Sequence, residues 1–309
     1  MRLVFMGTPD FAVPSLTALL QSSHSVAAVV TQPDRPRGRG KKLQPPPVKE
    51  AALAAGLPVM QPAAMKDPVF LNWLRQWQPE VIAVVAFGRI LPGEILTLPR
   101  RGCINLHASL LPRYRGAAPI HRAVINGEQE TGVTTMWIAP QLDAGDIILQ
   151  EKLAIEPEAA TGTIHDRLAA LGAALLVHTL DLVAEGRAPR RPQEEALVTY
   201  APPLRPEEER IDWGQPAANI YNLIRGLNPW PGAYTRRSGE RLKIYAARIV
   251  DTASTGTPGR VVDLTAEGFI VQTGKGRLLI TTVQPQGKRT MPAGAYQRGY
   301  PLTIGEVLE

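Results

Sequence analysis

Residues 103–120, CINLHASLLPRYRGAAPI, combine the pattern of a β-strand with polar residues suited to a reaction site. Ile104 and Leu106 alternate with Asn105 and His107, which is the twofold period of a strand. This period places Asn105 and His107 on one face, about 7 Å apart. The strand then breaks into a proline-containing loop, so we expect it to border a pocket.

A second polar element follows the apolar run at 133–138, where the chain reads QLDAGD at 141–146. Asn105 and His107 alone are typical of hydrogen-bonded surface residues. Asp143, on a glycine-containing loop after a strand, is placed to reach a histidine on a neighbouring strand and to orient it. Together, Asn105, His107 and Asp143 predict a site that stabilises an oxyanion and assists proton transfer.

These motifs also carry a family resemblance. The stretch 105–120, followed by LDAGD at 142–146, resembles the active-site signature of enzymes that transfer a formyl group from 10-formyltetrahydrofolate. The segments FMGTPDF at 5–11 and TQPDRPRGRGKK at 31–42 are similar to those of family members that act on methionyl initiator tRNA. The similarity continues through NPWP at 228–231, so it covers essentially the whole chain.

The resemblance implies that Asn105, His107 and Asp143 are catalytic and that 10-formyltetrahydrofolate is the formyl donor. Nothing in this chemistry calls for a metal. The resemblance also implies that the folate lies near the loop at 87–91 and near 139–143. The residues that we expect to bind it are Phe87, Gly88, Ile90, Leu91, Ser109, Leu110, Leu111, Pro112 and Leu142.

The segment 34–49 is rich in Lys, Arg, Gly and Pro, which by itself is typical of a solvated loop. The resemblance implies instead an inserted loop that grips the acceptor stem and 3′ end of the tRNA. The expected tRNA contacts in this loop are Arg35, Arg37, Arg39, Lys41 and Lys42. Further candidates in the basic last third are Arg236, Lys243, Lys288 and Arg289.

The first half of the chain alternates apolar strand-like runs, at 3–6, 26–31 and 81–87, with helical patterns. This alternation predicts an α/β fold with a doubly wound, Rossmann-like, mainly parallel sheet, to which 131–137 and 147–155 add antiparallel edge strands. The first turn departs from G-x-G-x-x-G, which argues against dinucleotide binding.

Short alternating segments from 242 to 283 predict a small β-barrel, which the resemblance implies to be OB-like. The expected domains are a formyltransferase catalytic domain at 1–188 containing the basic loop, a proline-rich linker at 189–206, and a tRNA-binding OB-like barrel at 207–309.

The composition is ordinary for a globular protein of 309 residues, and the net charge of +6 fits an anionic partner such as RNA. The single cysteine, Cys103, excludes an intrachain disulfide, and we interpret it as a packed core residue rather than a nucleophile. We find no apolar run that approaches a membrane span. We therefore expect a cytoplasmic monomer without membrane contact.

Three other functions fit part of the pattern. A formyltransferase acting on a sugar nucleotide, on glycinamide ribonucleotide or on another small amine would share Asn105, His107 and Asp143. A formyl-folate hydrolase would use the same residues with water as the acceptor. Neither needs the basic loop or a basic barrel, whereas a non-catalytic RNA-binding protein would need these features but not the three polar residues.

Overall fold

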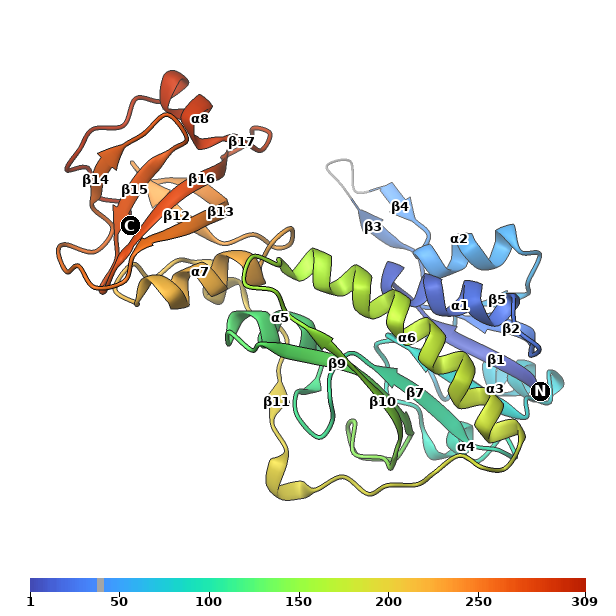
Figure 1. The fold of residues 1–309 in the computed structure, drawn as a ribbon. Helices are drawn as coiled ribbons and strands as arrows, with labels where there is room; N and C mark the ends of the chain where they lie inside the picture. Colours follow the sequence, from blue (N-terminus) through green and yellow to red (C-terminus); the bar gives the residue numbers. More distant parts are fainter. Residues whose placement is uncertain (38–41) are drawn as a thin grey trace. The chain divides into compact units, whose positions relative to one another are not determined.

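The structure, a computed structural model, describes residues 1–37 and 42–309 (Figure 1). The chain forms two compact units, each assembled from three stretches. The first unit contains Met1–Pro119, Glu130–Ala154 and His165–Pro202, and the second contains Ile120–Gln129, Ile155–Ile164 and Pro203–Glu309. The segment 189–206, expected as a linker, is thus divided: its residues up to Pro202 belong to the first unit.

The first unit is built on a seven-stranded sheet of order β10-β9-β7-β6-β1-β2-β5. Strands β7, β6, β1, β2 and β5 are parallel, whereas β9 runs antiparallel to β7 and β10 antiparallel to β9. The predicted Rossmann-like sheet with an antiparallel edge is confirmed. In chain order the strands are β1 (Arg2–Gly7), β2 (Ser25–Val30), β5 (Val59–Met60), β6 (Val81–Val85), β7 (Cys103–His107), β9 (Glu130–Trp137) and β10 (Ile147–Ala154).

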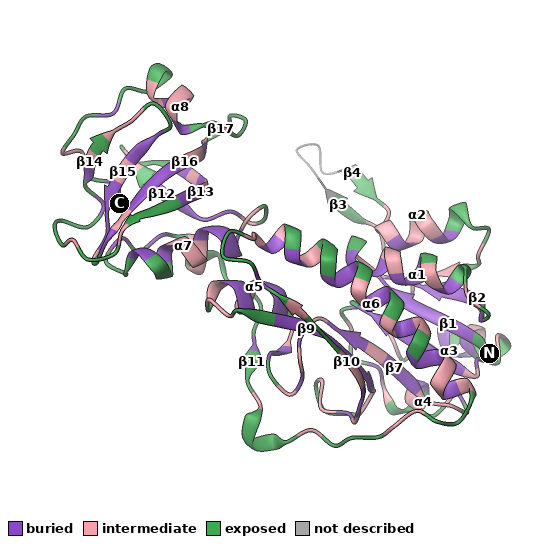
Figure 2. Cartoon of the chain, in the orientation of Figure 1, coloured by how far each residue is buried: buried purple, intermediate pink, exposed green. Residues whose placement is uncertain are grey.

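Helices pack on both faces of this sheet, and its central strands are buried (Figure 2). Phe70 of α3 and Ile95 of α4 share one apolar cluster with Cys103 of β7. On the opposite face, Gly172 of α6 packs against Leu106, where an added Cβ would lie 2.7 Å from a Leu106 methyl group. The helices of this unit are α1 (Val13–Leu20), α2 (Pro47–Ala54), α3 (Pro68–Gln76), α4 (Gly93–Leu96) and most of α6 (Thr161–Ala184).

Several short elements complete the first unit. The basic segment begins and ends in a pair of antiparallel strands, and a two-stranded parallel sheet joins the loop after β7 to the segment that follows α6. These elements are η1 (Asp10–Ala12), β3 (Arg35–Arg37), β4 (Lys42–Gln44), β8 (Arg115–Gly116), η2 (Glu195–Leu197) and β11 (Tyr200–Ala201).

The second unit is a curled antiparallel sheet of order β12-β13-β16-β15-β14, with β17 paired to β16. Its core includes Trp213, Ile224 and Phe269. This arrangement agrees with the small barrel expected for the last third. Its elements are α5 (Pro119–Ile125), η3 (Pro206–Glu209), α7 (Ala217–Gly226), β12 (Tyr234–Arg237), β13 (Glu240–Asp251), β14 (Val261–Leu264), β15 (Phe269–Gln272), β16 (Arg277–Pro285), β17 (Met291–Pro292) and α8 (Ala293–Gly299).

Among the helices of the described residues, α6 is long and apolar enough to cross a membrane by length and composition alone. The expectation that no apolar run approaches a span is therefore wrong by this measure. Part of α6 packs inside the first unit, as the core helix of a soluble protein does, so its length is weak support for a membrane span.

Candidate active site

The polar face of β7 carries Asn105 and His107, as the twofold period predicts. Asn105 is half-buried, and its side chain makes no hydrogen bond to any residue that the structure describes. His107 is buried at the end of the strand. Asn105 therefore offers a free amide group, which can donate to a carbonyl oxygen, next to a histidine shielded from solvent.

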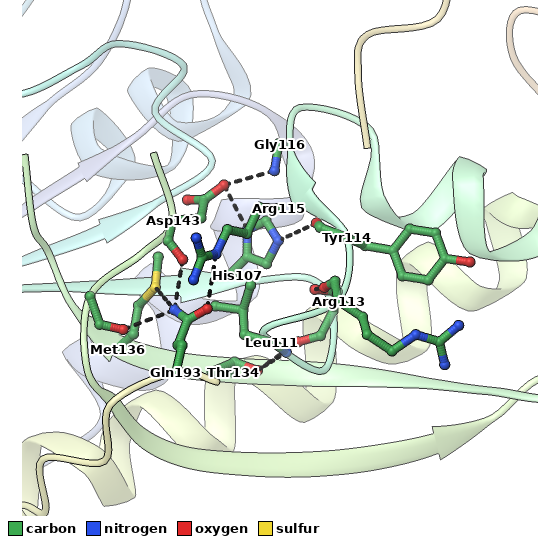
Figure 3. A network of polar contacts seen from close by, with 12 residues as sticks. His107, Leu111, Arg113, Tyr114, Arg115, Gly116, Thr134, Met136, Asp143 and Gln193 are labelled. Atoms are coloured by element: carbon green, nitrogen blue, oxygen red, sulfur yellow. Dashed lines mark hydrogen bonds and ion pairs between the residues drawn. The ribbon is translucent and has the colours of Figure 1, made fainter. Parts of the chain in front are cut away.

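The ring of His107 is oriented by the loop that follows β7 (Figure 3). Its Nε2 atom lies 2.9 Å from the carbonyl oxygen of Tyr114. Because a carbonyl oxygen only accepts hydrogen bonds, Nε2 carries a proton and donates it to Tyr114. The other ring nitrogen, Nδ1, is left for the reacting groups.

Asp143 faces this second nitrogen, with Oδ2 3.7 Å from His107 Nδ1. This separation suits an ion pair but is too long for a direct hydrogen bond. The same oxygen accepts a hydrogen bond of 2.9 Å from the backbone N–H of Gly116, which holds the carboxylate in place. The prediction that Asp143 reaches His107 is thus correct. However, the carbonyl of Tyr114 determines which His107 nitrogen carries the proton.

The loop that carries Asp143 starts far from His107 along the strand. Ile138 donates to the carbonyl of Cys103, at the beginning of β7, because β9 is antiparallel to β7. The loop must therefore return along the sheet before Asp143 meets His107. Asp143 has a φ of +49°, a left-handed conformation that is uncommon for residues other than glycine. An added Cβ at Gly145 would overlap the carbonyl oxygen of Trp137, so the return also requires glycine there.

The residues expected to bind the folate fall into two groups. Ile90 and Leu142 are 78% and 58% exposed, which leaves apolar surface able to pack against a flat ring. Gly88 is also exposed and Pro112 is partly exposed. The apolar and backbone character of these four residues fits an aromatic ligand such as a pterin.

The other expected folate residues are packed within the protein, and several of their polar groups form hydrogen bonds to other residues of the chain. Phe87, Leu91, Ser109 and Leu111 are buried, and Leu110 is half-buried against Gly132. The carbonyl of Phe87 accepts hydrogen bonds from Gln32 and Thr8, the hydroxyl of Ser109 donates to the carbonyl of Arg113, and the carbonyl of Leu111 accepts from Gln150. These residues shape the loops rather than offer free groups.

The basic loop is described at its two ends. Arg35 is exposed and its guanidinium donates to the side chain of Gln32. Arg37 and Lys42 lie in the paired strands β3 and β4, where the structure describes their backbone. Arg39 and Lys41 lie outside the described residues.

In the second unit the expected tRNA residues gather around β13. Lys243 pairs in register with Gln284 of β16, whose side chain donates to the carbonyl of Lys288. Lys288, Arg289 and Arg236 are exposed, whereas Lys243 is half-buried and donates to the carbonyl of Pro231. Three of these four cations are thus directed to solvent.

Cys103 is buried beneath the sheet, and its thiol lies near the carbonyl oxygens of Ile95 and Leu96. Burial raises the pKa of this thiol to about 12. The interpretation of Cys103 as a packed residue is confirmed.

Three contributors to the site were not found from the sequence: the carbonyl of Tyr114, the N–H of Gly116 and the side chain of Gln193. Two of them are backbone groups, which any residue supplies. Gln193 donates to the carbonyls of Asp143 and Gly145 from a proline-rich, charged segment that was interpreted as a linker.

Comparison with known proteins finds similarity along the whole chain. Residues 1–180 match the family model described as formyl transferase, and residues 203–301 match that of the formyl transferase C-terminal domain. A methionyl-tRNA formyltransferase of Moorella thermoacetica is 74% identical over 308 residues, covering 100% of this chain and 99% of the relative. The enzyme of the same name from Pelotomaculum thermopropionicum is 57% identical, covering 100% and 98% of the two chains.

Among solved structures, HypX from Aquifex aeolicus in complex with tetrahydrofolic acid superposes with a TM-score of 0.67 at 18% identity. The match covers 99% of this chain and 48% of HypX. At this identity the likeness shows that the fold is shared.

Proposed function

Because the chain belongs to the formyl transferase family, we propose that it transfers the formyl group of 10-formyltetrahydrofolate to the amino group of methionine esterified to initiator tRNA. The observation that carries the proposal is the likeness over the full length to enzymes named for methionyl-tRNA. It is supported by the placement of Asn105 and His107 on one face of β7, with Asp143 3.7 Å from His107. The reaction would serve the initiation of protein synthesis, in a cytoplasmic and monomeric enzyme.

In the proposed reaction the methionyl nitrogen attacks the formyl carbon and loses a proton. The carbon–nitrogen bond to N10 of the folate then breaks as N10 takes up that proton, so that tetrahydrofolate leaves. The free amide of Asn105 donates to the formyl oxygen as it becomes an oxyanion. His107, with Nε2 engaged by Tyr114, presents Nδ1 to the same centre. Asp143 stabilises the charged form of His107 and accepts the proton that the attacking nitrogen loses, directly or through a water molecule.

The donor is proposed to lie against the exposed apolar residues Ile90 and Leu142, close to Asp143 in the chain. A flat heteroaromatic ring buries apolar area there. The carbonyls of Phe87 and Leu111 and the hydroxyl of Ser109 already have protein partners, so the ring need not replace those hydrogen bonds. No metal is assigned a role in this scheme.

The tRNA is proposed to contact the basic loop 34–49 and the exposed cations of the second unit. The loop is the feature that a formyltransferase for a small amine, or a formyl-folate hydrolase, would not need. Its arginines and lysines suit the phosphates and unstacked bases of an acceptor end.

The proposal is tested by incubating the protein with 10-formyltetrahydrofolate and methionyl initiator tRNA, then measuring formyl-methionine after mild base hydrolysis. Methionyl elongator tRNA and a reaction without tRNA are the controls. We expect formylation of the initiator alone. Folate turnover in the tRNA-free reaction, without formyl-methionine in any other, would instead identify a hydrolase that transfers the formyl group to water.

A further inference from the structure

The segment 189–202, which we call the strap, is hydrogen-bonded at both ends to residues beside the candidate active site. At one end Arg191 and Ile147 exchange backbone hydrogen bonds of 2.8 and 3.0 Å, just after the loop that carries Asp143. At the other end β11 pairs with β8, and Thr199 accepts from the N–H groups of Tyr114 and Arg115. The strap therefore contacts the loop that follows β7 and the segment just after the loop that carries Asp143.

Gln193 lies between these two attachments and joins the loops through its side chain (Figure 3). Its Nε2 atom donates to the carbonyl of Asp143 at 2.7 Å and to that of Gly145 at 2.9 Å. Its Oε1 atom accepts from Nε of Arg115 at 3.0 Å. A glutamine side chain supplies both donors and the acceptor, which a carboxylate, an apolar residue or an arginine cannot do.

Arg115 anchors this junction rigidly. It is 4% exposed, and its guanidinium donates at 2.9 Å to the carboxylate of Glu195, an exposed residue of the strap. A buried guanidinium with satisfied partners has little freedom to move, because breaking its contacts would leave a desolvated charge. Gln193 thus links the backbone of Asp143 to the buried side chain of Arg115, next to His107.

We propose that Gln193 is a positioning residue for the reaction and acts by setting the carboxylate of Asp143 opposite His107 Nδ1. The inference rests on the proposed function. The Asp143 loop starts at the far end of β7 and reaches His107 in a left-handed conformation. Besides the Gly116 N–H, which holds the side chain, the two Gln193 hydrogen bonds hold the backbone at this turn. Without the two Gln193 hydrogen bonds, the Asp143 carboxylate could still accept a proton but would no longer be placed opposite His107 Nδ1.

The test uses Gln193→Met, which keeps the length of the side chain but removes the hydrogen bonds to Asp143, Gly145 and Arg115, together with the weak one to the Met136 sulfur. Since a misplacement of about 1 Å can cost about 100-fold in rate, we expect kcat to fall by about 10- to 100-fold, with KM for tRNA and folate little changed. Gln193→Glu is the second variant, because it retains an acceptor for Arg115 but cannot donate to the two carbonyls. It should lower kcat in the same way.

Gln272→Met provides a matched control. Gln272 is buried in the second unit, its Nε2 also donates to backbone carbonyls, and its Oε1 also accepts from an arginine Nε, that of Arg277, at 3.0 Å. This variant should lose thermal stability yet keep its kcat at saturating tRNA. Comparing Gln193→Met with Gln272→Met therefore distinguishes a general loss of stability from a loss of kcat caused by misplacement of Asp143.

A double-mutant cycle separates positioning from a general structural role. In an Asp143→Asn background, Gln193→Met should change kcat by no more than about twofold, because the group that it positions is already disabled. The inference is overturned if Gln193→Met and Gln193→Glu keep kcat within about twofold of the parent, or if the full loss persists in the Asp143→Asn background.

A second readout does not depend on activity. The chain has five histidines, so the Cε1–H resonance of His107 can be assigned with a His107→Asn variant. We expect Gln193→Met to shift this resonance in the direction that Asp143→Asn does, and Gln272→Met to leave it in place. An unshifted resonance in Gln193→Met contradicts the inference even if the protein formylates another acceptor, whereas an inactive parent with the expected shifts contradicts only the proposed function.

Discussion

The carbonyl oxygen of Tyr114 lies 2.9 Å from Nε2 of His107 and thereby leaves Nδ1 as the nitrogen that faces Asp143. A backbone group, and not the carboxylate, selects the tautomer of the neutral ring. Asp143 is therefore not needed to orient His107 and retains its second oxygen for the reaction.

Replacing Asp143 by Asn is expected to lower kcat by at least about 100-fold, because the amide neither accepts the proton nor stabilises the charged histidine. The fold should persist, since asparagine also tolerates a positive φ. Single-turnover formylation measures the loss. Asp146→Asn is the control on the same loop, since Asp146 faces Arg190 and not His107. Near-parent kcat in Asp143→Asn would exclude the proposed role.

Asn105→Ala is expected to reduce kcat by about 100- to 1,000-fold, the usual effect of removing one oxyanion donor. Its side chain has no hydrogen-bond partner among residues 1–37 and 42–309, so the substitution should cost little stability. Steady-state kinetics and a thermal melt measure the two effects. Asn72→Ala, on the exposed surface of α3, is the control. A large drop in Tm accompanied by normal kcat would show that Asn105 is structural.

Alanine at Arg236, Lys288 and Arg289 together should weaken tRNA binding, because these exposed side chains are proposed to meet phosphates. The slope of log K against log salt concentration should decrease by about 0.7–0.9 for each lost phosphate contact. Filter binding over a salt series measures the slope. Arg248→Ala is the control, because Arg248 is neutralised by Glu267. An unchanged slope in the triple variant would remove these residues from the tRNA site.

Arg122 in α5 holds the Glu208 carboxylate in the second unit and lowers its pKa from 4.5 to about 2. A carboxylate whose pKa is lower in the folded state than in the unfolded state stabilises the fold at pH values above its unfolded-state pKa. This contribution is lost as the pH falls through the folded-state pKa. Glu208→Gln should therefore cost about 1 kcal/mol of the free energy of unfolding at neutral pH, a figure reduced by partial solvent screening.

The difference between parent and Glu208→Gln should shrink between pH 4.5 and about 2, as urea denaturation at a series of pH values would show. The neighbouring Glu207→Gln is the control, since Glu207 is exposed. A constant difference across this range would mean that the ion pair does not contribute through its charge.

The Cys103 thiol should not react with Ellman's reagent in the native protein at slightly alkaline pH, because it is buried and its pKa is raised to about 12. The same thiol should react fully in concentrated guanidinium chloride. Cys103→Ala should retain formylation activity. Rapid reaction of the native protein, coupled to loss of activity, would contradict the packed role.

The sequence predicted the strand at 103–107, the polar face that it carries and the parallel core of the sheet, because each depends on local apolar periodicity. The return of the Asp143 loop could not be predicted in this way. It depends on partners far away in sequence, Gly116 and Gln193, and neither position has a local pattern that indicates the contact. Proline and charge at 189–206 indicated a linker, whereas hydrogen bonds to Tyr114 and Arg115 bring residues 199–201 into the first unit.

The second unit is assembled from stretches that leave the ribosome at widely separated times. Thr161 donates to the carbonyl of Gly226, Tyr221 to that of Pro157, and Gly226 leaves no room for a Cβ beside Ile125. The segments 120–129 and 155–164 must therefore wait on the nascent chain until α7 has been synthesised, whereas the first unit, which ends at Pro202, can already fold. A gene divided between residues 202 and 203 would separate α7 from these partners, so the two products would need to associate before the second unit could form.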